Sequence, residues 1–258
     1  MKEVISMNGL IVAGLIIPGI MTGIGAIPAL FARDVPRKWL DIMLGFAAGV
    51  MLSATCFSLI LPSIEHGGGT LTAVLVTAAG IVAGAAMIDL IDHYAPHEHL
   101  ISKHHEGVVT DSLKKIWLFV IAITIHNVPE GLAVGVAFGS NNPAGGIPIA
   151  IGIGLQNLPE GLAVAFALMR EKYSAKIAFW IALITGIIEP VMAFLGFGLV
   201  RLFKPALSFI LALAAGAMLF VIVDEVIPET HSSGNERAAS YAMLIGFVIM
   251  MVLDIALG

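Results

Sequence analysis

Eight long apolar runs take up most of this 258-residue chain. A helix needs about 20 apolar residues to cross a bilayer, and each run is that long or longer. Only 12% of the residues are charged, against about 25% in a soluble domain. We therefore predict an all-α integral membrane protein, one transmembrane domain over residues 1–258. The eight predicted helices are 8–31, 39–64, 70–91, 112–139, 145–169, 174–200, 205–230 and 237–257.

The basic residues predict how the chain is oriented, because lysine and arginine concentrate in cytoplasmic loops. One side of the predicted bundle carries ten of them: Arg33, Arg37, Lys38, Lys103, Lys114, Lys115, Arg170, Lys172, Lys176 and Arg237. The other side carries Lys2, Arg201 and Lys204. We expect both termini to face outward and the histidine-rich loop 92–111 to face the cytoplasm.

A polar motif occurs twice in the middle of apolar runs. Residues 126–131 read His-Asn-Val-Pro-Glu-Gly, and residues 156–161 read Gln-Asn-Leu-Pro-Glu-Gly. An ionisable group at bilayer depth costs free energy and is a functional hypothesis by default. Each proline also removes a backbone N–H, which frees the carbonyl of Ile125 in the first copy and of Leu155 in the second. Two such sites at one depth indicate a metal site.

The positions of the two copies predict the architecture around that site. The runs 112–139 and 145–169 are joined by a short loop, so they are expected to run antiparallel. The same motif on opposed helices implies a pseudo-two-fold axis in the membrane plane. Inverted repeats of this kind are typical of secondary transporters, whose substrate site lies at the repeat interface.

The spacing within each motif brings metal-binding groups together. His126 and Glu130 are four residues apart and share a helix face, with Asn127 on the other flank of the carboxylate. Three glutamates without a lysine or arginine would repel one another, and one or two divalent cations relieve that repulsion. Imidazole, carboxylate and amide groups suit Zn²⁺ and its first-row neighbours. The candidate set is Met51, His126, Asn127, Glu130, Gln156, Asn157, Glu160 and Glu189.

Plainer interpretations remain open at this point. A single Asn-x-Pro-Glu segment is also compatible with a kinked helix and a satisfied polar core. Met51 lies in an apolar helix, where a methionine usually packs. Cys56 is the one cysteine, which excludes an internal disulfide and a thiolate metal cluster.

Polar residues near both membrane surfaces complete a predicted pathway for metal ions. Glu65 and Asp254 are expected at the outer entrance. Five histidines in the loop 92–111 indicate weak metal binding, although a solvated polar loop explains them as well. The expected inner exit consists of Asp89, Asp92, His93, His97, His99, Asp224, Glu225, Glu229 and His231.

These motifs resemble the signature of the ZIP (Zrt/Irt-like) metal transporters, and the glutamine in the second copy resembles the GufA-like bacterial subgroup. The resemblance runs from the second helix to the C-terminus. It also rests on 45–52 (Gly-Phe-Ala-Ala-Gly-Val-Met-Leu), on 96–99 (Pro-His-Glu-His), on Glu189-Pro190 and on 225–231 (Glu-Val-Ile-Pro-Glu-Thr-His).

The resemblance implies uptake of divalent metal across a bacterial inner membrane by an eight-helix, often dimeric protein with extracellular termini. The expected cargo is Zn²⁺, with Cd²⁺, Fe²⁺ and Mn²⁺ as further candidates. It implies two metal positions between the helices 112–139 and 145–169, and a rocking or elevator motion. The first position matches Met51, His126, Glu130, Gln156 and Glu160; the second matches Asn127, Glu130, Asn157, Glu160 and Glu189.

Two residues depart from the pattern of some relatives. Asn157 replaces an aspartate, which weakens the charge at the second position, and Asp224 replaces a histidine, which makes the exit more acidic. Two other classes of protein are considered. An intramembrane metal-dependent hydrolase needs an open metal position, an activated water and a free general base. A carrier of organic substrates needs a pocket lined by basic or aromatic groups, which these helix centres lack.

Overall fold

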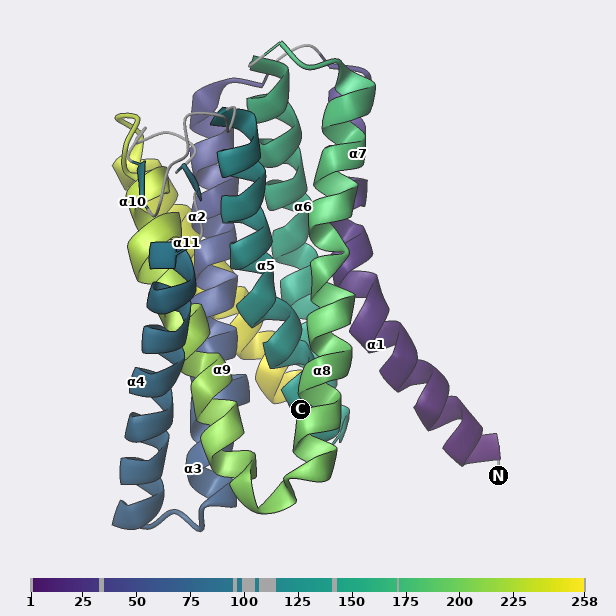
Figure 1. Cartoon of the computed structure of the whole chain (residues 1–258), viewed down its shortest axis with the longest axis vertical. Coiled ribbons are helices and arrows are strands. Elements are labelled where there is room, and N and C mark those ends of the chain that lie inside the picture. Colours follow the sequence, from purple (N-terminus) through teal and green to yellow (C-terminus); the bar gives the residue numbers. More distant parts are fainter. Residues whose placement is uncertain are drawn as a thin grey trace.

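The computed structural model describes residues 2–32, 35–94, 97–98, 105–106, 115–140, 143–170 and 172–257. Almost all of them lie in helices, which confirms the predicted all-helical class. Most of the long helices run along one common direction, and α1 slants away from it toward the N-terminus (Figure 1). The α-helices are α1 Lys2–Ala26, α2 Arg37–Ala54, α3 Leu61–His66, α4 Leu71–Tyr94, α5 Lys115–Gly139, α6 Gly146–Arg170, α7 Ala175–Gly186, α8 Ile188–Leu202, α9 Leu207–Val221, α10 Ile227–Thr230 and α11 Glu236–Leu257.

Shorter elements join or extend these helices. Three are 3₁₀-helices, η1 Ile27–Leu30, η3 Pro143–Gly145 and η4 Lys204–Ala206. Two are π-helical turns, η2 Thr55–Ile60 and η5 Ile222–Val226. The strands β1 His97–Glu98 and β2 His105–Glu106 pair antiparallel, with His97 opposite Glu106.

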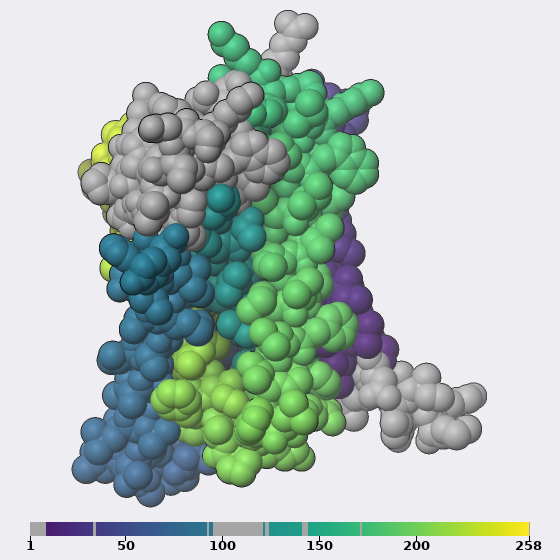
Figure 2. All heavy atoms as spheres, viewed as in Figure 1, coloured from purple at the N-terminus to yellow at the C-terminus, as the bar shows by residue number. Residues whose placement is uncertain are grey.

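Seven helical segments in the described part of the chain are long and apolar enough to cross a membrane. They are Gly9–Leu30, Arg37–His66, Leu71–Ile91, Gly146–Arg170, Ala175–Leu202, Lys204–Thr230 and Glu236–Leu257. The predicted run 112–139 corresponds to α5, which lies among them. Large apolar side chains such as Leu75 and Val82 of α4 and Val191 of α8 are exposed on the outer surface, one face of which is seen in Figure 2. Such a surface fits a lipid environment.

The helices pack as two groups. In one group α2 packs on α11, and α4 packs on α9. In the other, α5 packs on α8, and α1 packs on α6 and α7. The groups meet where α2 contacts α6 and where α5 contacts α9. The two motif helices therefore face the boundary between the groups.

Proline shapes three of the long helices. Pro62 and Pro228 each stand at the second residue after a π-helical turn, in α3 and α10. Because proline has no N–H, the helix cannot continue its regular hydrogen bonds there, and the backbone widens by one residue. The predicted helix 174–200 is interrupted at Ile187, three residues before Pro190. By contrast, α5 and α6 continue through Pro129 and Pro159.

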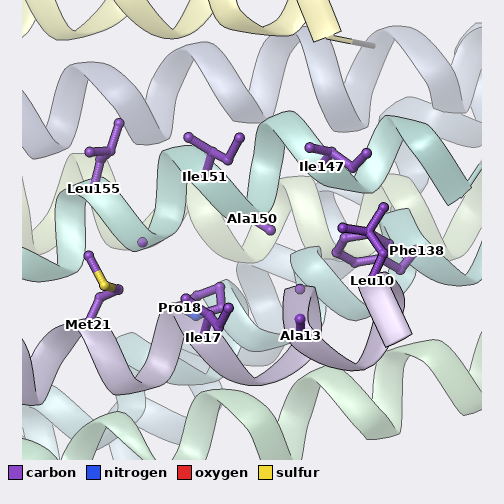
Figure 3. Close-up of a pocket in the computed structure, with 12 residues that line it drawn as sticks. Leu10, Ala13, Ile17, Pro18, Met21, Phe138, Ile147, Ala150, Ile151 and Leu155 are labelled. Atoms are coloured by element: carbon purple, nitrogen blue, oxygen red, sulfur yellow. The ribbon is translucent and has the colours of Figure 1, made fainter. Parts of the chain in front are cut away.

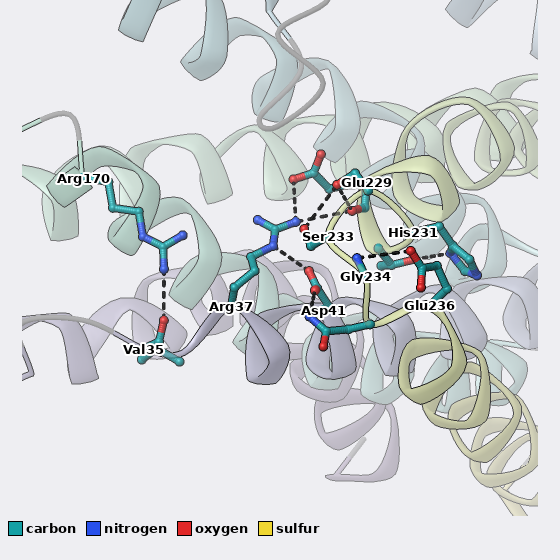
Figure 4. Close-up of polar contacts among 12 residues, drawn as sticks. Val35, Arg37, Asp41, Arg170, Glu229, His231, Ser233, Gly234 and Glu236 are labelled. Carbon is teal, nitrogen blue, oxygen red and sulfur yellow. Dashed lines mark hydrogen bonds and ion pairs between the residues drawn. The ribbon is translucent and has the colours of Figure 1, made fainter.

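An ion-pair network fixes the end of the bundle at which α2 begins, called here the Arg37 end (Figure 4). Arg37 Nε lies 2.7 Å from Asp41 Oδ1, and Arg37 Nη2 lies 3.3 Å from Glu229 Oε1 of α10. Asn235 Nδ2 donates to Asp41 Oδ2 at 2.8 Å. Arg170 of α6 donates to the Val35 carbonyl at 3.0 Å. The start of α2 is thus tied to α10 and to the turn before α11.

We expect the substitution Arg37→Met to destabilise the protein by about 3–5 kcal/mol, because it leaves the fully buried Asp41 carboxylate without its cation. Thermal unfolding in detergent measures this change. The control is Lys38→Met, which removes an exposed neighbouring charge. Equal unfolding midpoints for the two variants would contradict the structural role of Arg37.

A hollow of about 350 Å³ lies between α1 and α6 (Figure 3). Its lining is apolar and includes Leu10, Ile17, Phe138, Ile151 and Leu155. The lining includes no charged side chain.

Candidate metal centre

The two motifs place six polar side chains inside the bundle. From α5 come His126, Asn127 and Glu130, and from α6 come Gln156, Asn157 and Glu160; each is at most 8% exposed. Glu189 adds a third carboxylate from α8, 1% exposed. Burying charge at this depth is costly unless partners compensate. The contacts of these groups therefore decide what the site can do.

The first part of the site surrounds the imidazole of His126. Its Nε2 lies 3.5 Å from Glu160 Oε1 and 3.8 Å from Glu130 Oε1. One ligand atom from each of the three residues falls within 4.8 Å of the others. Gln156 Nε2 donates a hydrogen bond to Glu130 Oε1. Two carboxylates and one imidazole at this separation can bind a divalent cation.

The second part of the site is built from amides and Glu189. Asn157 Nδ2 donates to Glu189 Oε1 at 2.6 Å and to the Pro18 carbonyl of α1 at 2.8 Å. Asn127 Nδ2 donates to the Thr185 carbonyl at 2.8 Å. Each amide nitrogen is thus used by a fixed acceptor. The amide oxygens point elsewhere, which leaves them available as ligands.

Several oxygen atoms of this cluster lack hydrogen-bond donors. Six buried side-chain oxygens of this cluster have no hydrogen-bond partner among the described residues: Asn127 Oδ1, Glu130 Oε2, Gln156 Oε1, Asn157 Oδ1, Glu160 Oε1 and Glu189 Oε2. An unsatisfied buried polar atom costs about 1–3 kcal/mol, and more if it is charged. Glu189 also lies close enough to Glu130 and Glu160 for mutual repulsion. Bound cations would satisfy these oxygens and cancel the repulsion.

Comparison with known proteins points to one family of metal transporters. Residues 93–254 match the model of the family described as the ZIP zinc transporters. The chain belongs to the ZIP family. Two bacterial relatives are similar along most of the chain. The zinc transporter GufA of Myxococcus xanthus is 42% identical over 253 residues, which are 95% of this chain and 99% of that protein. The zinc transporter ZIPB of Bordetella bronchiseptica is 42% identical over 242 residues, 92% of this chain and 78% of that protein.

A human relative shows that the likeness extends beyond bacteria. The zinc transporter ZIP11 of Homo sapiens is 34% identical over 322 aligned residues, covering 92% of this chain and 94% of that protein. The GufA-like resemblance of the two motifs is confirmed by these matches.

Met51 is fully buried in α2 of this ZIP chain, in the same apolar cluster as Ala133 and Val134 of α5. Its backbone carbonyl accepts a hydrogen bond from the Thr55 hydroxyl at 2.8 Å. The position lies at the boundary between the helix groups. A role for its sulfur as a ligand remains a prediction.

Among the predicted exit residues, Glu225 contacts the site. Its Oε2 lies 3.5 Å from His126 Nδ1, on the opposite side of the ring from Glu160. Glu225 belongs to η5, and α9 and η5 lie in the other helix group. His126 therefore lies between the buried carboxylates of the site and the carboxylate of Glu225, which lies on the way to the Arg37 end.

Other predicted exit residues have partners of their own or are exposed. Glu229 pairs with Arg37, and both ring nitrogens of His231 are engaged, one of them with Ser240 at 3.1 Å. Asp89, His93 and Asp224 are exposed. His99 lies outside the described residues, as do the side chains of Asp92 and His97.

The predicted entrance residues do come together. Glu65 and Asp254 line one cavity of about 240 Å³, together with His66 and Ser58. Ser58 Oγ donates a hydrogen bond to Asp254. Sequence reasoning missed His66, although it directly follows Glu65. It also missed α1, which supplies the Pro18 carbonyl, because α1 carries no charged residue in its apolar part.

Proposed function

We propose that this ZIP protein carries Zn²⁺ across the membrane through the buried site between α5 and α6, in the direction of the cytoplasm. The observation that carries the proposal is the group of six buried oxygens without donors beside the His126 imidazole. The names of the similar proteins, zinc transporters in each case, support zinc as cargo. Cd²⁺, Fe²⁺ and Mn²⁺ are further candidate substrates.

The proposed ligands form two positions. The first is bound by Met51, His126, Glu130, Gln156 and Glu160, and the second by Asn127, Glu130, Asn157, Glu160 and Glu189. Mixed nitrogen and oxygen ligands without a thiolate favour exchange over tight retention. Glu130 is the residue expected to serve both positions.

The proposed pathway connects the two ends of the bundle. Cations enter at the cavity of Glu65, His66 and Asp254, whose carboxylates attract them. They leave along Glu225, which lies against the far side of His126. The surplus of basic residues at the Arg37 end supports an orientation in which this end faces the cytoplasm and both termini face outward. We place the protein in a bacterial inner membrane, as a homodimer.

Zinc flux into proteoliposomes that contain a trapped zinc-sensitive dye tests the proposal. Saturable uptake that depends on the protein is the expected result. Liposomes that take up no more zinc than empty ones, although the purified protein binds zinc, would overturn transport. That outcome would favour a metalloenzyme or a sensor, which the ZIP family match opposes.

A further inference from the structure

Thr22 of α1 has an unusual environment for a helical threonine. It is 1% exposed, and its hydroxyl has no hydrogen-bond partner among the described residues. A buried threonine in a helix commonly donates to a carbonyl three or four residues earlier. Thr55 does so to Met51 at 2.8 Å, and Thr185 does so to Ala182 at 2.9 Å.

The surroundings of Thr22 explain the difference. The carbonyl four residues earlier belongs to Pro18, and it receives Asn157 Nδ2 at 2.8 Å. The Thr22 hydroxyl lies near the Glu189 carboxylate, although no hydrogen bond of normal geometry joins them. Thr22 Oγ1, Asn157 Oδ1 and Glu189 Oε2 are thus three buried oxygens without a hydrogen-bond partner in one region of the bundle.

Two glycines hold α1 this close to the site. A Cβ added at Gly161 of α6 would lie 1.8 Å from the Thr22 carbonyl oxygen. A Cβ added at Gly186, the last residue of α7, would lie 2.9 Å from Thr22 Oγ1. The helix α6, which carries Asn157, and the end of α7, three residues before Glu189, therefore touch α1 at Thr22 itself.

The geometry points to Thr22 as an oxygen ligand of the second cation position, beside Asn157 Oδ1 and Glu189 Oε2. This assignment rests on the proposed function, and it extends the site to a helix outside the two motifs. A position formed by hydroxyl, amide and carboxylate oxygens, with no nitrogen or sulfur, suits oxygen-preferring cations such as Mn²⁺. The position beside His126 offers an imidazole and suits Zn²⁺.

The test compares Thr22→Val, which removes the hydroxyl, with Thr22→Ser, which keeps it. The control is Thr77→Val, because Thr77 is equally buried but is bonded to Ser63 at 2.7 Å in another part of the bundle. Calorimetric titration of the full-length protein in detergent with Mn²⁺ and with Zn²⁺ gives the affinities. Thermal unfolding without metal gives the stability of each variant.

We expect Thr22→Val to weaken Mn²⁺ binding by about tenfold or more and to leave one Zn²⁺ bound beside His126. Thr22→Ser keeps the wild-type affinity for both cations. Without metal, Thr22→Val unfolds at the wild-type temperature or higher, because it removes an unsatisfied buried hydroxyl. Thr77→Val unfolds at a lower temperature and binds metal normally.

Four results would overturn the assignment. Wild-type Mn²⁺ affinity in Thr22→Val would show that the hydroxyl is not a ligand, and so would a wild-type protein that binds Zn²⁺ but no Mn²⁺. A lower unfolding temperature of metal-free Thr22→Val would show a structural role instead. A wild-type protein that binds neither cation would overturn the proposed function together with the assignment.

Discussion

Zinc uptake is expected to fall by at least about 100-fold in the variant Glu130→Ala, while the protein remains folded. Loss of a group that only supports a metal ligand costs about 10–100-fold, and Glu130 is a proposed ligand of both positions. The fully buried carboxylate lies within reach of His126, accepts from Gln156 and keeps a second oxygen without a donor. Dye-loaded proteoliposomes measure the rate, and gel filtration checks the fold.

The matched control for this prediction is Glu236→Ala. Glu236 is an exposed glutamate at the start of α11, far in sequence from both motifs. Its loss is expected to leave uptake at the wild-type rate. Wild-type uptake in Glu130→Ala would mean that this carboxylate binds no transported cation.

The second large effect is expected from Gly161→Ala. The added Cβ would meet the Thr22 carbonyl oxygen at 1.8 Å, a backbone atom that cannot move without displacing α1. Overpacking of this kind costs about 1–3 kcal/mol or more. Because Gly161 directly follows Glu160, the displacement also disturbs the metal centre. We expect a lower unfolding midpoint in detergent and a loss of zinc binding.

A second glycine provides the comparison. A Cβ added at Gly198 of α8 meets no atom within 4 Å, and alanine is a better helix former by about 0.5–1 kcal/mol. Gly198→Ala is therefore expected to unfold at the wild-type temperature or slightly above it. If the two variants prove equally stable, the close contact between α1 and α6 is not as described.

The sequence predicts the site residues better than it predicts their partners. Local spacing suffices for His126 and Glu130, because residues four apart share a helix face. The contact of His126 with Glu225, and that of Asn157 with Pro18, depend on how distant helices pack, and no periodic pattern encodes this. For the same reason Glu229 could be recognised as acidic, but not as the partner of Arg37, 192 residues earlier.

The sequence also indicates where most irregularities of the helix backbone lie. Pro190 marks the region of the α7–α8 break, and Pro62 and Pro228 mark the regions of the two π-helical turns. The regular helices through Pro129 and Pro159 agree with the predicted helices 112–139 and 145–169. Proline removes one hydrogen bond, but the helix geometry persists where neighbouring helices pack around it.

The central claim is that divalent cations bind at the midplane between α5 and α6. The most direct test is an anomalous diffraction measurement at the zinc absorption edge on crystals grown with Zn²⁺. A zinc peak is expected among His126 Nε2, Glu130 and Glu160, with ligand distances of about 2.0–2.2 Å to nitrogen and oxygen. Zinc found only at the Glu65 cavity or at the loop 92–111, with the buried oxygens between α5 and α6 still without a cation, would contradict this claim.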